Sequence, residues 1–136
     1  MDLSDSLAIA ASGMTAQGTR LRVIAENIAN ADSTASKPGV DPYRRQVVTF
    51  KQQLDKASGT ATVAVDKVVT DKSDFNRKYE PGHPAADANG YVLMPNVNTL
   101  IETMDMREAQ RSYEANLGVI DLSRSMIADT VGLLRS

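Results

Sequence analysis

The stretch that decides the fold is residues 3–31, LSDSLAIAASGMTAQGTRLRVIAENIANA. Apolar side chains recur in it at alternating steps of four and three residues, which is the spacing of a heptad seam. The members of this seam are Leu3, Leu7, Ala10, Met14, Leu21, Ile24, Ile28 and Ala31, with Gln17 as a polar interruption. The pattern predicts one long N-terminal helix of roughly 40 Å, at about 1.5 Å per residue.

Two asparagines, Asn27 and Asn30, stand at the end of this predicted helix, in the run ENIANADST of residues 26–34. Asparagine disfavours helix interiors because its amide competes for backbone hydrogen bonds. Near a helix end the same amide can bond carbonyl groups that lack a partner. The two residues therefore indicate either an ordinary polar exit from the helix or a junction used in assembly.

Helical spacing returns in residues 97–134. Asn98 is a suitable N-cap, and Glu102 follows in the first turns, where a negative charge suits the helix dipole. One apolar stripe of this helix consists of Tyr113, Leu117, Ile120, Ile127, Val131 and Leu134. A second stripe, nearly opposite on the helical wheel, consists of Ala115, Val119, Leu122, Met126 and Leu133. A helix in a two-helix hairpin needs only one apolar face, so two faces predict more than one neighbour.

The middle of the chain lacks helical spacing. Residues 32–59 form a predicted connecting segment that is rich in proline and small polar residues, with VVTF (47–50) as a possible strand. Residues 60–96 predict a small β-rich module, because TATVAVDKVVT, FNRKY and YVLMP alternate like short strands. The domain organisation is therefore a helix over 1–31, a connection over 32–59, a β-rich outer module over 60–96 and a helix over 97–136.

These segments predict a mainly α fold with a small β-rich module, in which the terminal helices pair as an antiparallel coiled coil and the short strands lie in the middle. Such a monomer would expose a large apolar strip, which soluble monomers rarely do. The simplest interpretation is that the second helical face packs against other subunits.

Composition excludes several functions. The 136 residues carry a net charge of −2, which argues against a nucleic-acid or anionic-membrane surface. There is no cysteine, and His83 is the single histidine, so a Cys- or His-rich metal site is excluded. The N-terminus does not resemble a conventional signal peptide, and no stretch has the length of a membrane span. No nucleophile motif or phosphate loop is present, so we expect no enzyme activity, no cofactor and no metal.

Two segments resemble the terminal motifs of the bacterial flagellar rod and hook proteins. They are SGMTAQGTRLRVIAENIANADST (12–34) and PNVNTLIETMDMREAQRSYEANLGVIDLSRSMI (95–127). PYRRQVVTF (42–50) and YEPGHPAADANGYVLMPNVN (79–98) narrow the resemblance to the proximal-rod branch of that family. The segment before Tyr43 is longer than in many axial relatives, so the resemblance does not predict the path of residues 32–44.

The resemblance implies a structural subunit of the flagellar basal-body rod that transmits torque from the motor to the hook and filament. It implies packing against copies of itself and other rod proteins in a helical array. It also implies uncleaved export by the flagellar type III apparatus into the periplasmic rod, with MS-ring or export-gate adaptor proteins as further candidate partners. The alternatives are another axial rod component and, outside this class, a soluble coiled-coil adaptor or export chaperone.

Residues of the seams and motifs are the candidate subunit contacts. They are Leu7, Met14, Leu21, Ile24, Asn27, Ile28, Asn30, Tyr43, Tyr113, Asn116, Leu117, Ile120, Ile127 and Val131. We expect a charge at one of these positions to block assembly, because it would bury an unpaired carboxylate or ammonium group.

Overall fold

The structure is a computed structural model that describes residues 2–136. Its elements follow one another as α1 (Leu3–Ala29), β1 (Gln46–Leu54), β2 (Ala61–Thr70), β3 (Asn76–Tyr79), β4 (Tyr91–Met94) and α2 (Thr99–Arg135). The long helices at both ends and the strands between them confirm the predicted mainly α architecture with a small antiparallel strand module.

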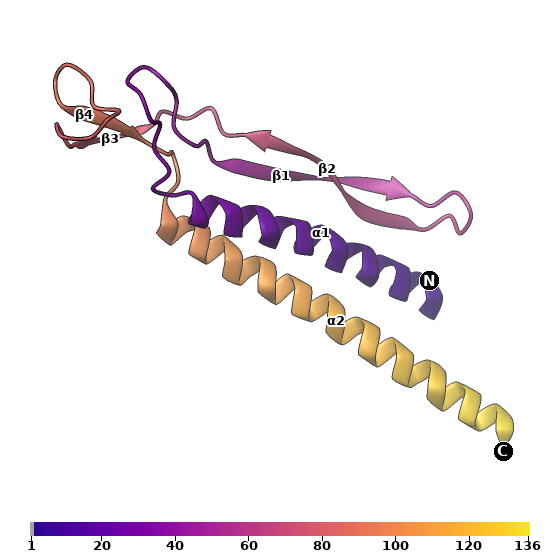
Figure 1. The fold of residues 1–136 in the computed structure, drawn as a ribbon. Coiled ribbons are helices and arrows are strands. Elements are labelled where there is room, and N and C mark those ends of the chain that lie inside the picture. Colours follow the sequence, from indigo (N-terminus) through magenta and orange to yellow (C-terminus); the bar gives the residue numbers. More distant parts are fainter. Residues whose placement is uncertain (1) are drawn as a thin grey trace.

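The elements are stacked in three layers, with α1 in the middle (Figure 1). The hairpin of β1 and β2 lies along one side of α1, and α2 lies along the other side in the opposite direction. Among the described elements, α2 packs only against α1, whereas α1 also contacts both strands of the hairpin. It is therefore α1 that is covered on two sides, and α2 keeps its second side open.

Each helix begins with a side-chain cap. The Asp5 carboxylate accepts a hydrogen bond from the backbone N–H of Asp2 at 3.2 Å, as in half of a capping box. Asn98 Oδ1 accepts from the backbone N–H groups of Leu100 and Ile101 at 3.1 and 3.4 Å, which confirms Asn98 as the N-cap of α2. The first helix ends at Ala29, two residues before the predicted end.

The β1–β2 hairpin is antiparallel, from Gln46 opposite Thr70 to Leu54 opposite Ala61, with a bulge after Thr49. Two polar contacts fasten its loop end and β2 to the N-terminal half of α1. Thr60 donates to Asp5 Oδ1 at 2.6 Å, and the Ser12 hydroxyl accepts from the N–H of Val63 at 3.3 Å. The hairpin therefore covers α1 over most of its length.

The strand prediction was incomplete. β1 occupies residues 46–54, inside the segment that was expected to be a connection. The possible strand VVTF (47–50) is part of this nine-residue strand. The strands also form two separate two-stranded sheets, β1–β2 and β3–β4, and not one module of three strands. The second half of β1 is exposed throughout and so lacks the apolar alternation that marks a strand, which explains its missed length. The division into four domains stays a prediction.

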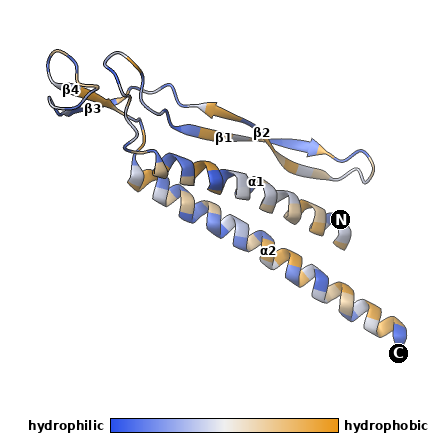
Figure 2. Cartoon of the chain, viewed as in Figure 1, coloured by the Kyte–Doolittle hydropathy of each residue, from blue (hydrophilic) through white to orange (hydrophobic). Residues whose placement is uncertain are grey.

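The core is small and made of short side chains. Its buried apolar residues are Ala10, Ala16, Val23, Ile24, Val92, Val97 and Ala109. Many larger apolar side chains stay exposed, and hydrophobic residues recur along the C-terminal half of α2 (Figure 2). The chain thus folds around α1, the helix of the middle layer, while many of its large apolar side chains stay exposed.

A polar junction and an open helix face as the candidate functional site

Asn27 anchors a buried cluster where both helices and the long hairpin meet. Its side chain is 1% exposed, and its amide makes four hydrogen bonds. The Nδ2 group donates to the carbonyl of Gln46 at 2.8 Å and to Glu102 Oε2 at 3.2 Å. The Oδ1 atom accepts from the hydroxyl of Tyr43 at 2.8 Å and from the N–H of Gln46 at 2.9 Å. An asparagine amide offers two donors and two acceptor lone pairs, so all its capacity is used.

Asn30 has the more local role that a helix end allows. Its Nδ2 group donates to the carbonyl of Glu26 at 2.8 Å, and its Oδ1 atom accepts from the Ser33 hydroxyl at 3.0 Å. These bonds close the last turn of α1 and direct the chain away from it. The two asparagines thus differ: Asn30 is a polar exit, whereas Asn27 is a tertiary junction.

Tyr43 joins the segment between α1 and β1 to this cluster, because its hydroxyl donates to Asn27. Partial burial raises the pKa of its hydroxyl, and the nearby charges of Glu26 and Glu102 raise it further. The hydroxyl therefore stays protonated and remains a donor to Asn27 at neutral pH.

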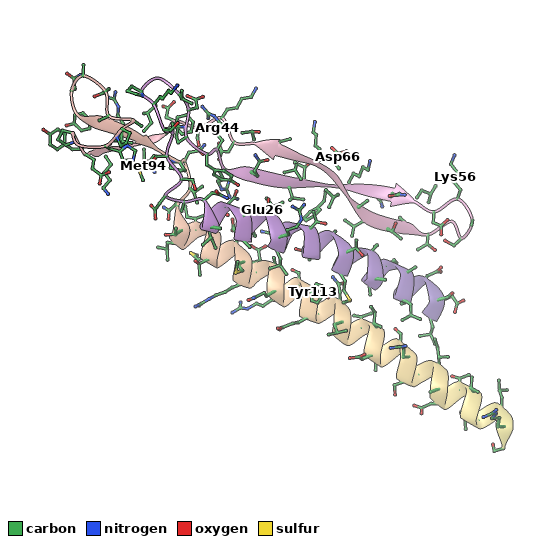
Figure 3. All side chains as sticks on the ribbon, in the orientation of Figure 1. Glu26, Arg44, Lys56, Asp66, Met94 and Tyr113 are labelled. Carbon is green, nitrogen blue, oxygen red and sulfur yellow. The ribbon has the colours of Figure 1, made fainter. Side chains whose placement is uncertain are left out.

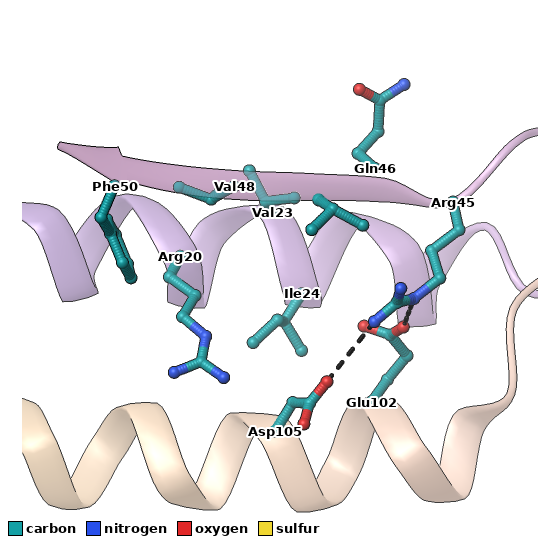
Figure 4. A pocket seen from close by; sticks show the side chains of 10 residues that line it. Arg20, Val23, Ile24, Arg45, Gln46, Val48, Phe50, Glu102 and Asp105 are labelled. Atoms are coloured by element: carbon teal, nitrogen blue, oxygen red, sulfur yellow. Dashed lines mark hydrogen bonds and ion pairs between the residues drawn. The ribbon is translucent and has the colours of Figure 1, made fainter. Parts of the chain in front are cut away.

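Arg45 links three carboxylates, two from α2 and one from the residue that follows β2. Its guanidinium pairs with Glu102 and with Asp105 at 3.4 Å (Figure 4). It also pairs with Asp71 at 3.4 Å. Glu102 is 0% exposed, so this is a buried ion pair whose oxygens are also hydrogen-bonded by Asn27. Burial alone lowers the pKa of Arg45, but the hydrogen bonds and charges of Glu102 and Asp71 together outweigh it, and the pKa lies above its usual value.

Asn96, which follows β4, and Asp71, which follows β2, complete the cluster. Asn96 accepts from the backbone N–H of Arg45 at 2.8 Å and donates to the carbonyl of Asp71 at 3.0 Å. The backbone and side chain of Ser73, and then Arg45, lower the pKa of Asp71. We call this cluster the polar junction; its members are Asn27, Tyr43, Arg45, Gln46, Asp71, Asn96, Glu102 and Asp105.

A pocket of about 300 Å³ opens beside the junction, between β1 and the two helices (Figure 4). Val23, Ile24 and Phe50 form its apolar wall, and Arg20 and Asp105 lie on its polar side. No group of three or more His, Cys, Asp or Glu side chains within residues 2–136 is arranged to hold a metal ion.

The two helices meet along a seam with a fixed register. Arg20 pairs with Glu108 at 3.6 Å, and a Cβ added to Gly13 would lie 2.6 Å from Asn116 Nδ2, so the glycine permits close approach here. On α2, the positions facing α1 are buried or half-buried at steps of four and three residues. They are Glu102, Met106, Ala109, Tyr113, Asn116, Ile120 and Ser123. The C-terminal turns of α2 extend past the start of α1 (Figure 1).

The side of α2 that faces away from α1 is covered by no other described element (Figure 3). We call its apolar residues the outer stripe: Ile101, Met104, Ala115, Val119, Leu122, Met126 and Leu133. Met104 is 62% exposed, Leu122 63% and Leu133 77%. This open face contains the second apolar stripe that the sequence predicted.

The candidate contact residues fall into three groups. Ile24 and Asn27 are buried within the chain. Half-buried positions are Leu7, Met14, Leu21, Ile28, Asn30, Tyr43, Tyr113, Asn116 and Ile120. Exposed positions are Leu117, Ile127 and Val131. Asn27 and Tyr43 meet in the junction, whereas the contact of any of these residues with another subunit stays a prediction.

Sequence reasoning missed the charged half of the junction. Glu102 was interpreted only as a favourable first-turn acid, and Arg45 and Asp71 were not singled out. One available signal was position: Glu102 continues the four-and-three spacing of Tyr113, Asn116 and Ile120 back along α2. A carboxylate on a seam needs a buried partner, and this would have prompted a search for a basic residue.

Comparisons with known proteins support one family. Residues 88–133 match the family model described as flagellar basal body rod FlgEFG protein C-terminal, and residues 7–35 match that of flagella basal body rod protein. The chain is 56% identical to the flagellar basal-body rod protein FlgC of Agrobacterium fabrum, over 98% of this chain and 96% of the relative. It is 44% identical to FlgC of Salmonella typhimurium, over 98% of both chains, and 39% identical to FlgC of Borreliella burgdorferi, over 99% of both.

Proposed function

The chain belongs to the FlgC family of flagellar basal-body rod proteins, and we propose that this structural rod subunit polymerises through its terminal helices into the shaft that carries motor torque to the hook and filament. The observation that carries the proposal is the open outer stripe of α2. Monomeric soluble proteins rarely keep this many large apolar side chains exposed along one helix face, and such a face marks a binding surface.

The paired helices suit this role. Their opposite directions, together with the four-and-three spacing of the α2 positions that face α1, support an antiparallel coiled coil. In this arrangement α1 is shielded by the hairpin on one side, and α2 presents its outer stripe to neighbouring subunits. The β1–β2 hairpin then lies on the side of α1 away from α2 and faces outward from the helical contacts.

The polar junction suits mechanical load. A shaft must pass torque between its helices and its outer parts without a change of angle between them. Asn27, Arg45 and Glu102 bind the end of α1, the start of β1 and the start of α2 into one hydrogen-bonded unit. Fully satisfied buried polar networks have strict geometric requirements, so they favour one arrangement of these elements.

We place the subunit in the periplasmic rod of the basal body and infer uncleaved export by the flagellar type III apparatus. Its partners are copies of itself and other rod proteins, with MS-ring or export-gate adaptor proteins as further candidates. No helix within residues 2–136 is long and apolar enough to cross a membrane. The role is structural, with no catalytic step, metal or cofactor.

The test is a single charge in the outer stripe. Leu122→Asp places a carboxylate in the proposed interface but, in the free chain, leaves it in solvent. We expect the purified variant to keep its helix content, while cells that carry it as their only copy lose rods and motility. Gln110→Asp, at an exposed position on the flank of α2, is the matched control and keeps both. Normal rods with Leu122→Asp would reject the proposed interface.

A further inference from the structure

The pocket beside the polar junction is bordered by β1 and by both helices (Figure 4). Val23, Ile24 and Phe50 form its apolar wall, and Phe50 is 40% exposed, so the edge of this wall is open to solvent. The volume of about 300 Å³ lies at the lower limit of small-molecule pockets. The size therefore suits one long side chain of a neighbouring protein better than a metabolite.

Carboxylates outnumber guanidinium groups around this pocket. Arg45 shares its guanidinium among three carboxylates of the polar junction, and Arg20 pairs with Glu108 at 3.6 Å. No other lysine or arginine within residues 2–136 forms an ion pair with these four carboxylates. Two formal positive charges thus face four negative ones, and the excess favours a cationic occupant.

Asp105 is the carboxylate that has spare hydrogen-bonding capacity at the pocket. Its side chain lines the pocket and is 30% exposed. An ionised carboxylate offers about four lone-pair sites. Within the described part of the chain, Asp105 accepts one hydrogen bond, from Arg45 at 3.4 Å, and Arg45 also serves two other carboxylates. The remaining acceptor sites of Asp105 are therefore available to a donor that enters the pocket.

Resting on the proposed function, we propose that this pocket receives an arginine side chain from a helix of another rod protein. Its guanidinium group stacks on the ring of Phe50 and donates to Asp105, while its aliphatic stem lies against Val23 and Ile24. Arginine suits both contacts, because its planar fork of donors matches a carboxylate and its weakly hydrated face stacks on aromatic rings. The added charge also reduces the negative excess around the pocket.

Other side chains fit the pocket less well. A purely apolar side chain would cover Asp105 without giving it a new partner, and an unpaired buried charge is strongly unfavourable. A carboxylate would add to the negative excess. Lysine supplies a charge, but it lacks the planar group that can stack on Phe50 and bind Asp105 through two parallel hydrogen bonds.

The position of the pocket indicates a helix that also covers the outer stripe. Asp105 lies four residues after Ile101, so their side chains are neighbours on the surface of α2. A helix that covers the start of the stripe therefore passes the mouth of the pocket. A copy of this chain that used the same face would have to be rotated by half a turn, which does not fit an array wound round one shaft. The occupant is therefore a different rod protein.

The contact connects a neighbouring subunit directly to the polar junction. Asp105 and Arg45 belong to the network that holds the end of α1, the start of β1 and the start of α2 together. An arginine bonded to Asp105 extends this network across the subunit boundary. Force on the neighbour then reaches the helices and the hairpin of this chain through hydrogen bonds as well as through apolar contact.

Photo-crosslinking at the edge of the pocket tests the inference. Phe50 is replaced by p-benzoylphenylalanine, which keeps an aromatic ring there and reacts with nearby C–H bonds under ultraviolet light. Basal bodies from cells in which this variant is the only copy are illuminated and analysed by mass spectrometry. We expect position 50 to be joined to an arginine, or to a residue next to it, on a helix of another rod protein. The same group at Lys67, which is exposed on β2 outside the pocket, is the control and does not join that helix.

Each of the other results overturns the inference. A crosslink to a second copy of this chain contradicts the partner, and a crosslink away from any arginine contradicts the chemistry. Intact rods without a crosslink at position 50 mean that nothing enters the pocket. The same crosslink from Lys67 means that the contact is not specific to the pocket.

Two substitutions of Asp105 give an independent measurement that leaves Phe50 in place. Asp105→Asn removes the charge, while Arg45 retains its two other carboxylates. We therefore expect the free chain to keep its urea midpoint and the number of rods per cell to fall several-fold, whereas Asp105→Glu retains the charge and the rods. Equal rod numbers for the two variants, or a loss of rods that accompanies a lower urea midpoint of Asp105→Asn, would overturn the role of Asp105 in docking.

These outcomes differ from those that test the proposed function. If Leu122→Asp abolishes rods but position 50 forms no crosslink, only the inference about the pocket fails. If Leu122→Asp builds normal rods, the outer stripe is not the interface, and the proposed function loses the observation that supports it.

Discussion

Asn27→Asp is the sharpest perturbation of the polar junction, because it exchanges two donor hydrogens for an oxygen and keeps the shape of the side chain. The acceptor side is preserved, so Tyr43 and the N–H of Gln46 keep their partner. The donor side is lost, and an oxygen now faces the carbonyl of Gln46 and the carboxylate of Glu102, which accept from Nδ2 at 2.8 and 3.2 Å.

The magnitude follows from burial. Loss of two hydrogen bonds costs about 0.5–1.5 kcal/mol each. The second carboxylate is placed where Asn27 is 1% exposed, and a buried charge without its own partner costs about 3–5 kcal/mol in mutational data. These effects overlap, so we expect the free energy of unfolding at pH 7 to fall by about 3–5 kcal/mol in total. That is a large part of the 5–15 kcal/mol stability of a typical domain.

Urea unfolding followed by far-ultraviolet circular dichroism measures this loss. With an m-value of about 2 kcal/mol/M, the midpoint shifts down by about 2 M. Burial beside Glu102 raises the pKa of the introduced carboxyl group, so the deficit shrinks as the pH falls and the group becomes protonated. Asn76→Asp, at an exposed position of β3, is the control and changes stability by less than about 0.5 kcal/mol.

A second substitution tests the cause. Glu102→Gln removes the opposing charge and supplies an amide that can donate to the introduced carboxylate. In the Asn27→Asp background it should therefore recover about 1–2 kcal/mol, as residues in one network usually couple. The reasoning is refuted if Asn27→Asp unfolds within about 1 kcal/mol of the parent at pH 7, or if Glu102→Gln makes the double variant less stable still.

The remaining predictions concern a hydroxyl and two glycines. Tyr43→Phe removes the bond to Asn27 and lowers stability by about 1 kcal/mol at pH 7. Because the folded-state pKa of Tyr43 is raised, the stability that its hydroxyl contributes is complete below about pH 10 and is lost as the pH rises through the raised pKa. The Tyr43→Phe variant lacks this pH-dependent loss, and urea midpoints measured from about pH 8 to 11 compare the two proteins. Gly18→Ala, with nothing within 4 Å of the added Cβ, stabilises α1 by up to about 1 kcal/mol. Gly13→Ala does not gain this stability, because the added Cβ lies 2.6 Å from Asn116. In the Gly13→Ala background, Asn116→Ala removes the clash and restores the gain. Equal melting temperatures for Gly18→Ala and Gly13→Ala would contradict the close approach of Asn116 to Gly13.

Local patterns were enough to predict the helices. The steps of three and four residues located α1 and α2, and Asn98 marked the start of α2 because a cap acts on groups only two or three residues away. The second apolar stripe of α2 was also visible, since a helical wheel depends on spacing alone. What the stripe faces is not a local property, and the structure shows that it faces away from α1.

The junction could not be predicted because its contacts join distant parts of the chain. Glu102 lies 57 residues from Arg45 and 75 from Asn27, so no window of sequence contains the network. β1 was only partly predicted for a related reason: its second half is exposed and is held by pairing with β2, not by apolar alternation. Propensity gives way to tertiary context in both cases.

The distribution of apolar side chains argues that assembly, more than folding, is where this chain gains apolar stabilisation. The buried core contains mostly alanine and valine, whereas Leu122, Met104 and Leu133 are at least 62% exposed. Burying a side chain of that size contributes about 1.5–3 kcal/mol, so covering the outer stripe would contribute on the order of 10 kcal/mol before the costs of association. That equals the stability of a whole domain, so the apolar face of α2 is a large reserve of stabilisation that only a neighbour can use. We therefore expect the free subunit to stay monomeric only at low concentration, because association covers this face.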